Sequence, residues 1–237
     1  MLKTTGPILP PFNFNNAEIA AHSPEVTGRI LLNSLCERLG WNSLRGRRLL
    51  DFGCGVRFAR TIYNLEIDIA QYCGIDANAA AIAWLRENVR DPRFRFEYLD
   101  MRNAMYNPGG SDAGVADAMQ ALGLRDFDAA CMFSVITHQP PQQSDVIFAM
   151  LRPCAPRLYF TAFIDDGVED YADRDPSQPL LLATYSSGHI RRLLAKADWH
   201  VDNIFAPSLF QLTAFVCSAE PRRGIADMIA SRWRGPR

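Results

Sequence analysis

Two glycines and an aspartate are spaced as a site for a ribose-containing ligand requires. Gly53 and Gly55 follow the strand-like run RLLDF at residues 48–52, and glycines after a strand let a ligand approach the backbone closely. The glycine pair alone would also suit a tight turn. Asp76 lies 21 residues beyond Gly55, and an acidic residue about 20 residues after such a loop binds ribose hydroxyl groups. Together these residues predict a nucleotide-type cofactor.

The residues around this loop favour a cationic cofactor over a nicotinamide dinucleotide. Phe58 stands where the dinucleotide fingerprint has its third glycine. Asp51, two residues before the first glycine, would place a carboxylate near an anionic pyrophosphate. The same charge suits a sulfonium ligand that carries an amino group. An NAD(P)-binding reductase therefore stays as the less favoured alternative.

The third strand-like run, FRFEYLD, also ends in an aspartate, Asp100. With it, the ordered motifs resemble those of the class I S-adenosylmethionine-dependent methyltransferases. The resemblance covers about 170 residues, from Arg48 to Cys217, and includes a final pair of strands that this family places antiparallel at one sheet edge. Its motifs are LLDFGCG, YCGIDANAAAIAWLRENV, FEYLDM and FDAACMFSVITHQPP.

The resemblance implies S-adenosylmethionine as the cofactor and a role for each motif. It implies that Asp51, Gly53 and Gly55 bind the methionine part and that Asp76 binds the ribose hydroxyls. It implies that the adenine is contacted by Ala77, Asp100 and Met101. It also implies that the floor beside the sulfonium and its methyl group is lined by Phe133 and Ser134.

Arg57 departs from the family, which commonly has a glycine at that position. We expect its side chain to point into solvent or towards the next helical turn, which leaves the backbone of the two glycines accessible. A side chain that narrowed the pocket would instead lower the affinity for the cofactor. Because of this departure, a protein that binds the cofactor but has lost turnover stays as an alternative to an active enzyme.

His138 is the candidate catalytic base. Methyl transfer from a sulfonium needs alignment and exclusion of water, and a base only where the acceptor must lose a proton. The near-neutral pKa of histidine suits that role, and the alternative is a histidine that caps or orients the next helix. Ser134 and Thr137 occupy positions where metal-assisted relatives carry glutamates, so no metal is expected.

The chain alternates strand-like and helical runs, which predicts one doubly wound α/β domain over residues 1–237. Its mostly parallel seven-stranded sheet would have an antiparallel edge strand, and its parts would be an N-terminal segment (1–45), a core (46–218), a lid candidate (165–186) and a basic tail (219–237). The expected strands are 48–52, 71–75, 93–98, 128–133, 158–163, 201–204 and 212–217. The expected helices are 24–39, 58–63, 79–89 with Asn78 as N-cap, 142–151 and 187–197.

Composition limits the partners. A net charge of −1 argues against a nucleic-acid-binding domain, and the five arginines of the tail are expected to form a solvated end. No apolar run approaches the roughly 20 residues of a membrane helix, and the N-terminus lacks a signal peptide, so a cytoplasmic protein is expected.

Six scattered cysteines without metal-ligand spacing predict neither disulfides nor zinc.

The expected activity is O-methylation of a small molecule, a saccharide or a lipid-linked glycan. It rests on analogy with bacterial methyltransferases that share the SVITHQPP and FTAFIDD patterns. The acidic residues at 165–175 could attract a cationic or hydroxyl-rich acceptor, or serve only as a solvated loop. The identity of the acceptor and the oligomeric state stay open.

Overall fold

The computed structural model describes residues 7–8, 24–174, 182–207 and 211–221. Most of the basic tail expected at 219–237 lies outside these residues. Within them, no helix combines the length and the apolar character that a membrane crossing requires.

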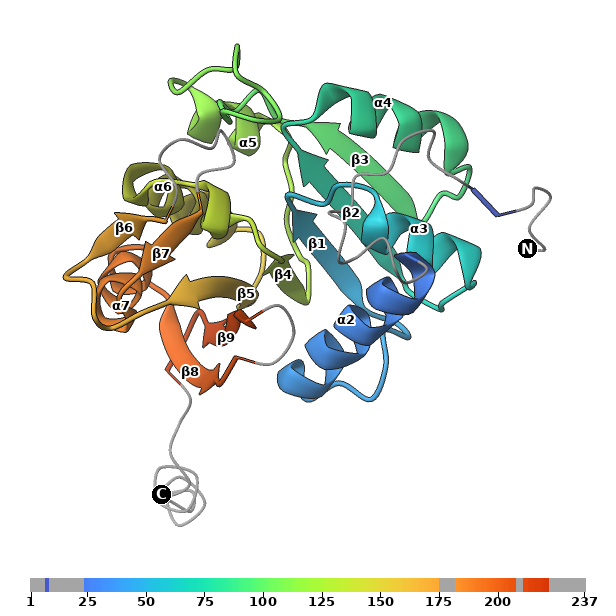
Figure 1. Ribbon diagram of the computed structural model, residues 1–237. Helices are drawn as coiled ribbons and strands as arrows, with labels where there is room; N and C mark the ends of the chain where they lie inside the picture. Colours follow the sequence, from blue (N-terminus) through green and yellow to red (C-terminus); the bar gives the residue numbers. More distant parts are fainter. Residues whose placement is uncertain (1–6, 9–23, 175–181, 208–210, 222–237) are drawn as a thin grey trace, which may run out of the picture.

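A mostly parallel sheet forms the centre of the molecule (Figure 1). Its parallel strands run in the spatial order β3-β2-β1-β4-β5. Strand β9 pairs antiparallel with β5, and β8 pairs antiparallel with β9 at the edge. These strands are β1 (Arg48–Phe52), β2 (Gln71–Asp76), β3 (Phe94–Tyr98), β4 (Ala129–Met132), β5 (Arg157–Ile164), β8 (His200–Phe205) and β9 (Thr213–Ser218). The predicted fold class is confirmed.

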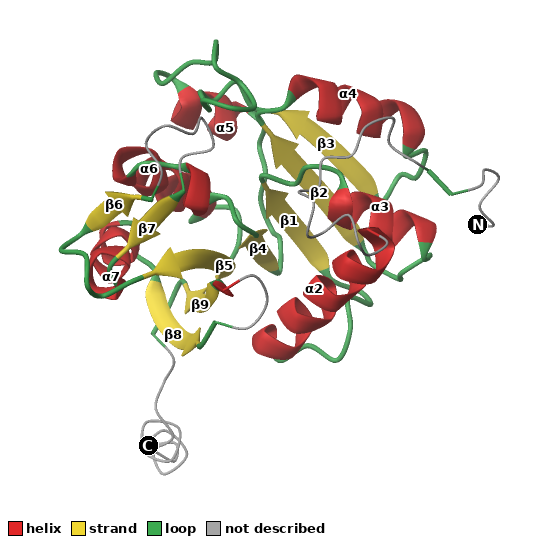
Figure 2. Ribbon diagram, viewed as in Figure 1, coloured by secondary structure: helices red, strands yellow, loops and turns green. Residues whose placement is uncertain are grey.

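Helices cover both faces of this sheet, as Figure 2 shows. One hydrophobic cluster joins α2, α3 and α4 to one face, and a second cluster joins α5, α6 and α7 to the other. The helices are α2 (Pro24–Leu39), α3 (Arg57–Asn64), α4 (Ala79–Asn88), α5 (Val115–Ala121), α6 (Pro141–Leu151) and α7 (Ser187–Lys196). Neighbouring residues of a strand point to opposite faces of the sheet: Leu49 packs in the first cluster and Leu50 in the second.

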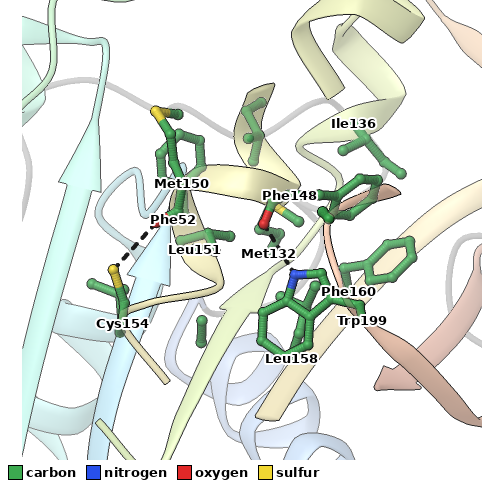
Figure 3. Close-up of a cluster of buried hydrophobic side chains, with 14 of the residues drawn as sticks. Phe52, Met132, Ile136, Phe148, Met150, Leu151, Cys154, Leu158, Phe160 and Trp199 are labelled. Atoms are coloured by element: carbon green, nitrogen blue, oxygen red, sulfur yellow. Dashed lines mark hydrogen bonds between the residues drawn. The ribbon is translucent and has the colours of Figure 1, made fainter. Parts of the chain in front are cut away.

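The cluster under α6 fixes the position of β4 and β5. Phe148 of α6 packs against Phe160 of β5 with ring centroids 5.1 Å apart, and the indole N–H of Trp199 donates to the carbonyl of Phe148 over 3.0 Å (Figure 3). Met132 and Ile136, on either side of the β4 tip, are fully buried beside them. The tip of β4 is therefore held rigidly where the chain leaves the sheet.

The lid candidate at 165–186 is partly sheet rather than loop. Its described residues form β6 (Tyr171–Asp173) and β7 (Ala183–Tyr185), an antiparallel pair; residues 175–181 lie outside the described part. β7 runs parallel to the last two residues of β5, whereas β9 pairs with residues 157–162. The sheet thus branches along β5 and extends beyond the seven expected strands.

Candidate functional site

A cavity of about 1050 Å³ opens at the carboxyl ends of β1, β2 and β4. Such an edge, where the strand order reverses, is the usual ligand site of open α/β sheets. In this sheet the strand order reverses at β1, because β1 lies between β2 and β4. The predicted site residues that line this cavity are Asp51, Gly53, Gly55, Asp76, Ala77, Met101, Phe133, Ser134 and His138.

The turn after β1, which we call the glycine loop (residues 53–55), needs both of its glycines. Gly53 has a φ of +72° and Gly55 a φ of +46°, a region that other L-residues adopt at a cost. A Cβ on Gly53 would also lie 2.4 Å from Cγ2 of Val135, at the β4 tip. A Cβ on Gly55 would meet open space. The loop therefore packs against β4 through one glycine and presents bare backbone to the cavity at the other.

Asp76 is fixed at the tip of β2 by the loop that it faces. One carboxylate oxygen accepts the N–H of Gly55 over 2.7 Å, and the other accepts the N–H of Asn78 over 2.8 Å. Burial raises the pKa of Asp76, and these backbone bonds act against that rise. Each carboxylate oxygen can accept a further hydrogen bond, so this rigid group can still bind a pair of hydroxyls.

Asp51 lies in the floor of the cavity and is almost fully buried, with an exposed fraction of 2%. The hydroxyl of Tyr72 donates to one of its carboxylate oxygens over 2.5 Å, and the thiol of Cys131 approaches the other at 3.5 Å. Burial raises the pKa of Asp51 to about 7, despite these two donors. A cation bound above the floor would favour the charged form of this group.

The β4 tip turns sharply at Ser134, which has a φ of +56°. Its N–H donates to the hydroxyl of Thr161 on β5 over 2.9 Å, and its carbonyl accepts the hydroxyl of Thr137 over 2.7 Å. These bonds hold an unusual backbone conformation in place, a feature that concentrates at functional sites. The short helix η1 (Ile136–His138) follows and brings His138 to the cavity wall.

The structure does not bring Asp100 to the site. Leu99 and Met101 line the cavity, whereas Asp100 is not among the described residues of its wall. Its exposed carboxylate accepts hydrogen bonds from the amide of Asn107 and the hydroxyl of Tyr98, which lower its pKa. Because side chains alternate along extended chain, the apolar neighbours face inwards and the aspartate faces out.

Arg57 does not point into solvent, one of the two orientations expected for it; the other was towards the next helical turn. It is the first residue of α3, it is partly buried, and it lines the cavity. Burial lowers the pKa of its guanidinium. A positive charge therefore stands beside the glycine loop, where the resembled family commonly has no side chain.

Sequence reasoning missed the wall that faces the glycine loop. Tyr159, Thr161 and Phe163 of β5 line the cavity at alternating positions, and we call them the β5 wall. Arg38 of α2 and Arg174 after β6 also line it. The alternation along β5 could have indicated the wall, but nothing near either arginine in the sequence marks it as a wall residue.

No group of three or more histidine, cysteine or acidic side chains is placed to hold a metal ion within the described part of the chain. All six cysteines are buried and reduced. Burial raises the pKa of the Cys54, Cys73 and Cys131 thiols beneath the site, which makes them poor nucleophiles.

No family model matches the sequence, but solved structures match the fold. A magnesium protoporphyrin IX methyltransferase from Synechocystis, solved with bound S-adenosylmethionine, aligns at 13% identity with a TM-score of 0.52, over 83% of this chain and 79% of that one. The same enzyme with the bound demethylated product aligns at 14% identity with a TM-score of 0.52, over 83% of each chain.

A further neighbour is an S-adenosylmethionine-dependent methyltransferase from Mesorhizobium loti. It aligns at 13% identity with a TM-score of 0.50, over 76% of this chain and 94% of that one. The chain thus has the fold of the class I S-adenosylmethionine-dependent methyltransferases.

Proposed function

We propose that this protein is an S-adenosylmethionine-dependent methyltransferase. The observation that carries the proposal is the bond from the N–H of Gly55 to the carboxylate of Asp76 in the cavity wall. It joins the bare backbone of the loop and a half-buried carboxylate into one unit that suits a ribose and the chain attached to it. The fold and the solved neighbours support the same assignment.

The residues present fit this cofactor. Asp76 would accept the two ribose hydroxyls, and the apolar side chains of Leu99 and Met101 would flank the adenine. Asp51 would supply a negative charge below the cationic end, through a floor from which water is excluded. The burial of Asp51 also makes a dinucleotide less suitable, because its charge would oppose a pyrophosphate.

Bound S-adenosylmethionine supplies a methyl group already activated on a sulfonium. The protein must align an acceptor with that group and keep water out. The ring of Phe133 packs edge-on against that of Phe58, with centroids 4.8 Å apart, and lies tilted against that of Tyr159 at 5.0 Å, which makes the floor apolar. His138 at the wall would take the proton from an acceptor hydroxyl.

The proposed reaction is O-methylation of a small molecule or a saccharide, including a lipid-linked one. A cavity of about 1050 Å³ is large enough for a cofactor and a small acceptor together, since ligand pockets span about 300–1,000 Å³. A histidine in the wall favours a hydroxyl acceptor over one that needs no deprotonation, because its side chain can take up a proton.

A cofactor-binding protein without turnover is the second candidate. Arg57 in the cavity wall favours it, because a cation near the loop would oppose the cationic methyl donor more than its neutral-sulfur product. Release of the demethylated cofactor distinguishes the two candidates, since only an enzyme produces it.

The test is a screen of hydroxylated acceptors that follows formation of S-adenosylhomocysteine. We expect turnover with at least one acceptor, and His138→Ala should lower kcat by about 10²–10⁴-fold with cofactor affinity unchanged. His200→Ala, at an exposed position on β8, is the matched control and should have no effect. Cofactor binding without turnover by any acceptor would favour the second candidate, and an unchanged rate in His138→Ala would exclude it as the base.

A further inference from the structure

The three side chains of the β5 wall lie in a row along the cavity surface, where Tyr159 and Thr161 are almost fully buried (1% and 5% exposed) and Phe163 is half-buried. Tyr159, Thr161 and Phe163 lie on one face of the strand because successive side chains alternate. At about 3.3 Å per residue, the first and third are about 13 Å apart. An arginine contacts each end of this surface.

Arg38 of α2 is fixed at the Tyr159 end. Its Nη1 donates to the hydroxyl of Tyr159 over 2.9 Å, and its guanidinium carbon lies 5.0 Å from the centroid of the Phe205 ring. The side chain is partly buried and lines the cavity. A guanidinium stacked on a ring uses its face, and the N–H groups in its plane are those that bind carboxylate or phosphate oxygens.

Arg174 occupies the Phe163 end in a similar way. Its guanidinium carbon lies 4.5 Å from the centroid of the Phe163 ring, and its Nε donates to the hydroxyl of Thr184 over 2.8 Å. The residue is exposed but also lines the cavity. It therefore places a positive charge nearer the solvent than Arg38 does.

The negative charges of the cavity lie elsewhere. Among the described residues that line it, the acidic ones are Asp51 and Asp76, at the tips of β1 and β2. Asp76 is bonded to the glycine loop, and Asp51 is almost fully buried in the floor. The described wall along β5 thus combines aromatic rings with two guanidinium groups and has no carboxylate of its own.

We propose that the acceptor carries an anionic group, a carboxylate or a phosphate, which Arg38 binds at the β5 wall while Arg174 attracts it to the cavity. This inference rests on the proposed function, because it names the acceptor class for that site. Arg38 acts through a direct pair with the anionic oxygens. Arg174 acts mainly through its field near solvent, so its effect should weaken with salt.

The test uses matched pairs of acids and neutral counterparts on the protein loaded with S-adenosylhomocysteine. The carboxylates are 4-hydroxybenzoate, salicylate and caffeate, each paired with its amide, and phenyl phosphate is paired with phenol. Calorimetry should show at least one acid binding about tenfold or more tightly than its neutral partner, since a charge-assisted pair is worth about 1.5–3 kcal/mol. The carboxylate and phosphate arms identify which oxyanion is preferred.

Variants then locate the effect. Arg38→Gln should remove about tenfold or more of the affinity for the acid and leave that for the neutral partner unchanged, and Arg38→Lys should recover only a part. Arg174→Gln should lower acid affinity about threefold at low salt and less at high salt. Arg29→Gln, exposed on the same helix, is the matched control and should change nothing.

Several outcomes overturn the inference: amides that bind as well as acids, no acid that binds, or acid binding that Arg38→Gln leaves intact. Unchanged affinity for S-adenosylhomocysteine in Arg38→Gln shows that the variant is folded, and Arg174→Gln provides a second variant. The same pairs are titrated without S-adenosylhomocysteine. A protein that fails to bind the cofactor product contradicts the proposed function, whereas one that binds it and prefers amides contradicts only the anionic acceptor.

Discussion

The wall at the tips of β1 and β2 relies on backbone conformation, whereas the wall along β5 relies on side chains. Gly53 and Gly55 adopt left-handed conformations, and the carboxylate of Asp76 is bonded to backbone N–H groups. The β5 wall consists instead of alternating side chains, flanked by Arg38 stacked on Phe205 of β8 and by Arg174 stacked on Phe163. The first wall should be intolerant of change and common to many acceptors, and the second should determine which acceptor binds.

The largest expected effect is at the backbone-built wall, from Gly53→Ala. The new Cβ would meet Val135 at 2.4 Å in a conformation that already disfavours alanine, so the free energy of unfolding should fall by about 3 kcal/mol and cofactor binding should be lost. Gly46→Ala is the matched control, because Gly46 has a φ of +71° but open space around it. It should cost about 1 kcal/mol. Urea unfolding of both variants measures the difference, and equal losses would show that contact with β4 is unimportant.

The second prediction separates two aspartates at neighbouring strand tips. Asp76→Ala should weaken cofactor binding by about tenfold to 100-fold, because a charged acceptor worth about 1.5–3 kcal/mol is removed. Asp100→Ala should leave the affinity unchanged, since that carboxylate is exposed and outside the cavity wall. Calorimetry with S-adenosylhomocysteine gives both values. A larger loss of affinity in Asp100→Ala than in Asp76→Ala would instead support Asp100 as a contact to the adenine.

The third prediction concerns pH and the buried floor. Burial raises the pKa of Asp51 to about 7, so its ionised fraction falls about tenfold between pH 8 and pH 6. Because the charged form favours a cation, affinity for S-adenosylmethionine should fall by up to about tenfold over that range. Asp51→Asn should bind with a flat pH profile. A wild-type profile that is flat would exclude Asp51 as the partner of the cationic end.

The same group has the opposite effect on the stability of the unliganded protein. A carboxyl whose folded pKa lies above its unfolded value of 3.8 keeps its proton in the folded state while the unfolded state has lost it. The free energy of unfolding should therefore decrease as pH rises from about 4 to 7, and Asp51→Asn should remove that decrease. Urea unfolding at several pH values measures it.

The smallest expected effect concerns Arg57, the first residue of α3, which lines the same cavity as the glycine loop. Arg57→Gln should raise affinity for cationic S-adenosylmethionine about threefold and change that for neutral-sulfur S-adenosylhomocysteine less, since a partly buried like charge is removed. Equal changes for both ligands would indicate a steric rather than an electrostatic role.

The contrast between the two walls also explains what the sequence could predict. The glycine loop, Asp76 and Asn78 were predictable because each depends on local conformation: Asn78 caps α4 by accepting the N–H of Ala81. The outward turn of Asp100 depends on which face of one extended segment is buried. Sequence spacing places that residue at the strand tip but does not give its direction.

The β5 side was less predictable for a different reason. Strands β6 and β7 have three residues each, too few for a periodic pattern, and they form only by pairing with each other and with the end of β5. Arg38 reaches Tyr159 across 121 residues of sequence. Contacts of that range are set by packing of the whole domain and leave no local signal.

The central claim is that the loop and carboxylate at the β1 and β2 tips bind S-adenosylmethionine, and calorimetric titration of the wild-type protein tests it most directly. The account predicts that S-adenosylmethionine and S-adenosylhomocysteine bind at one site per chain, that Asp76→Ala weakens both, and that NAD⁺ and NADP⁺ do not bind. Binding of a nicotinamide dinucleotide in preference to S-adenosylmethionine would contradict it.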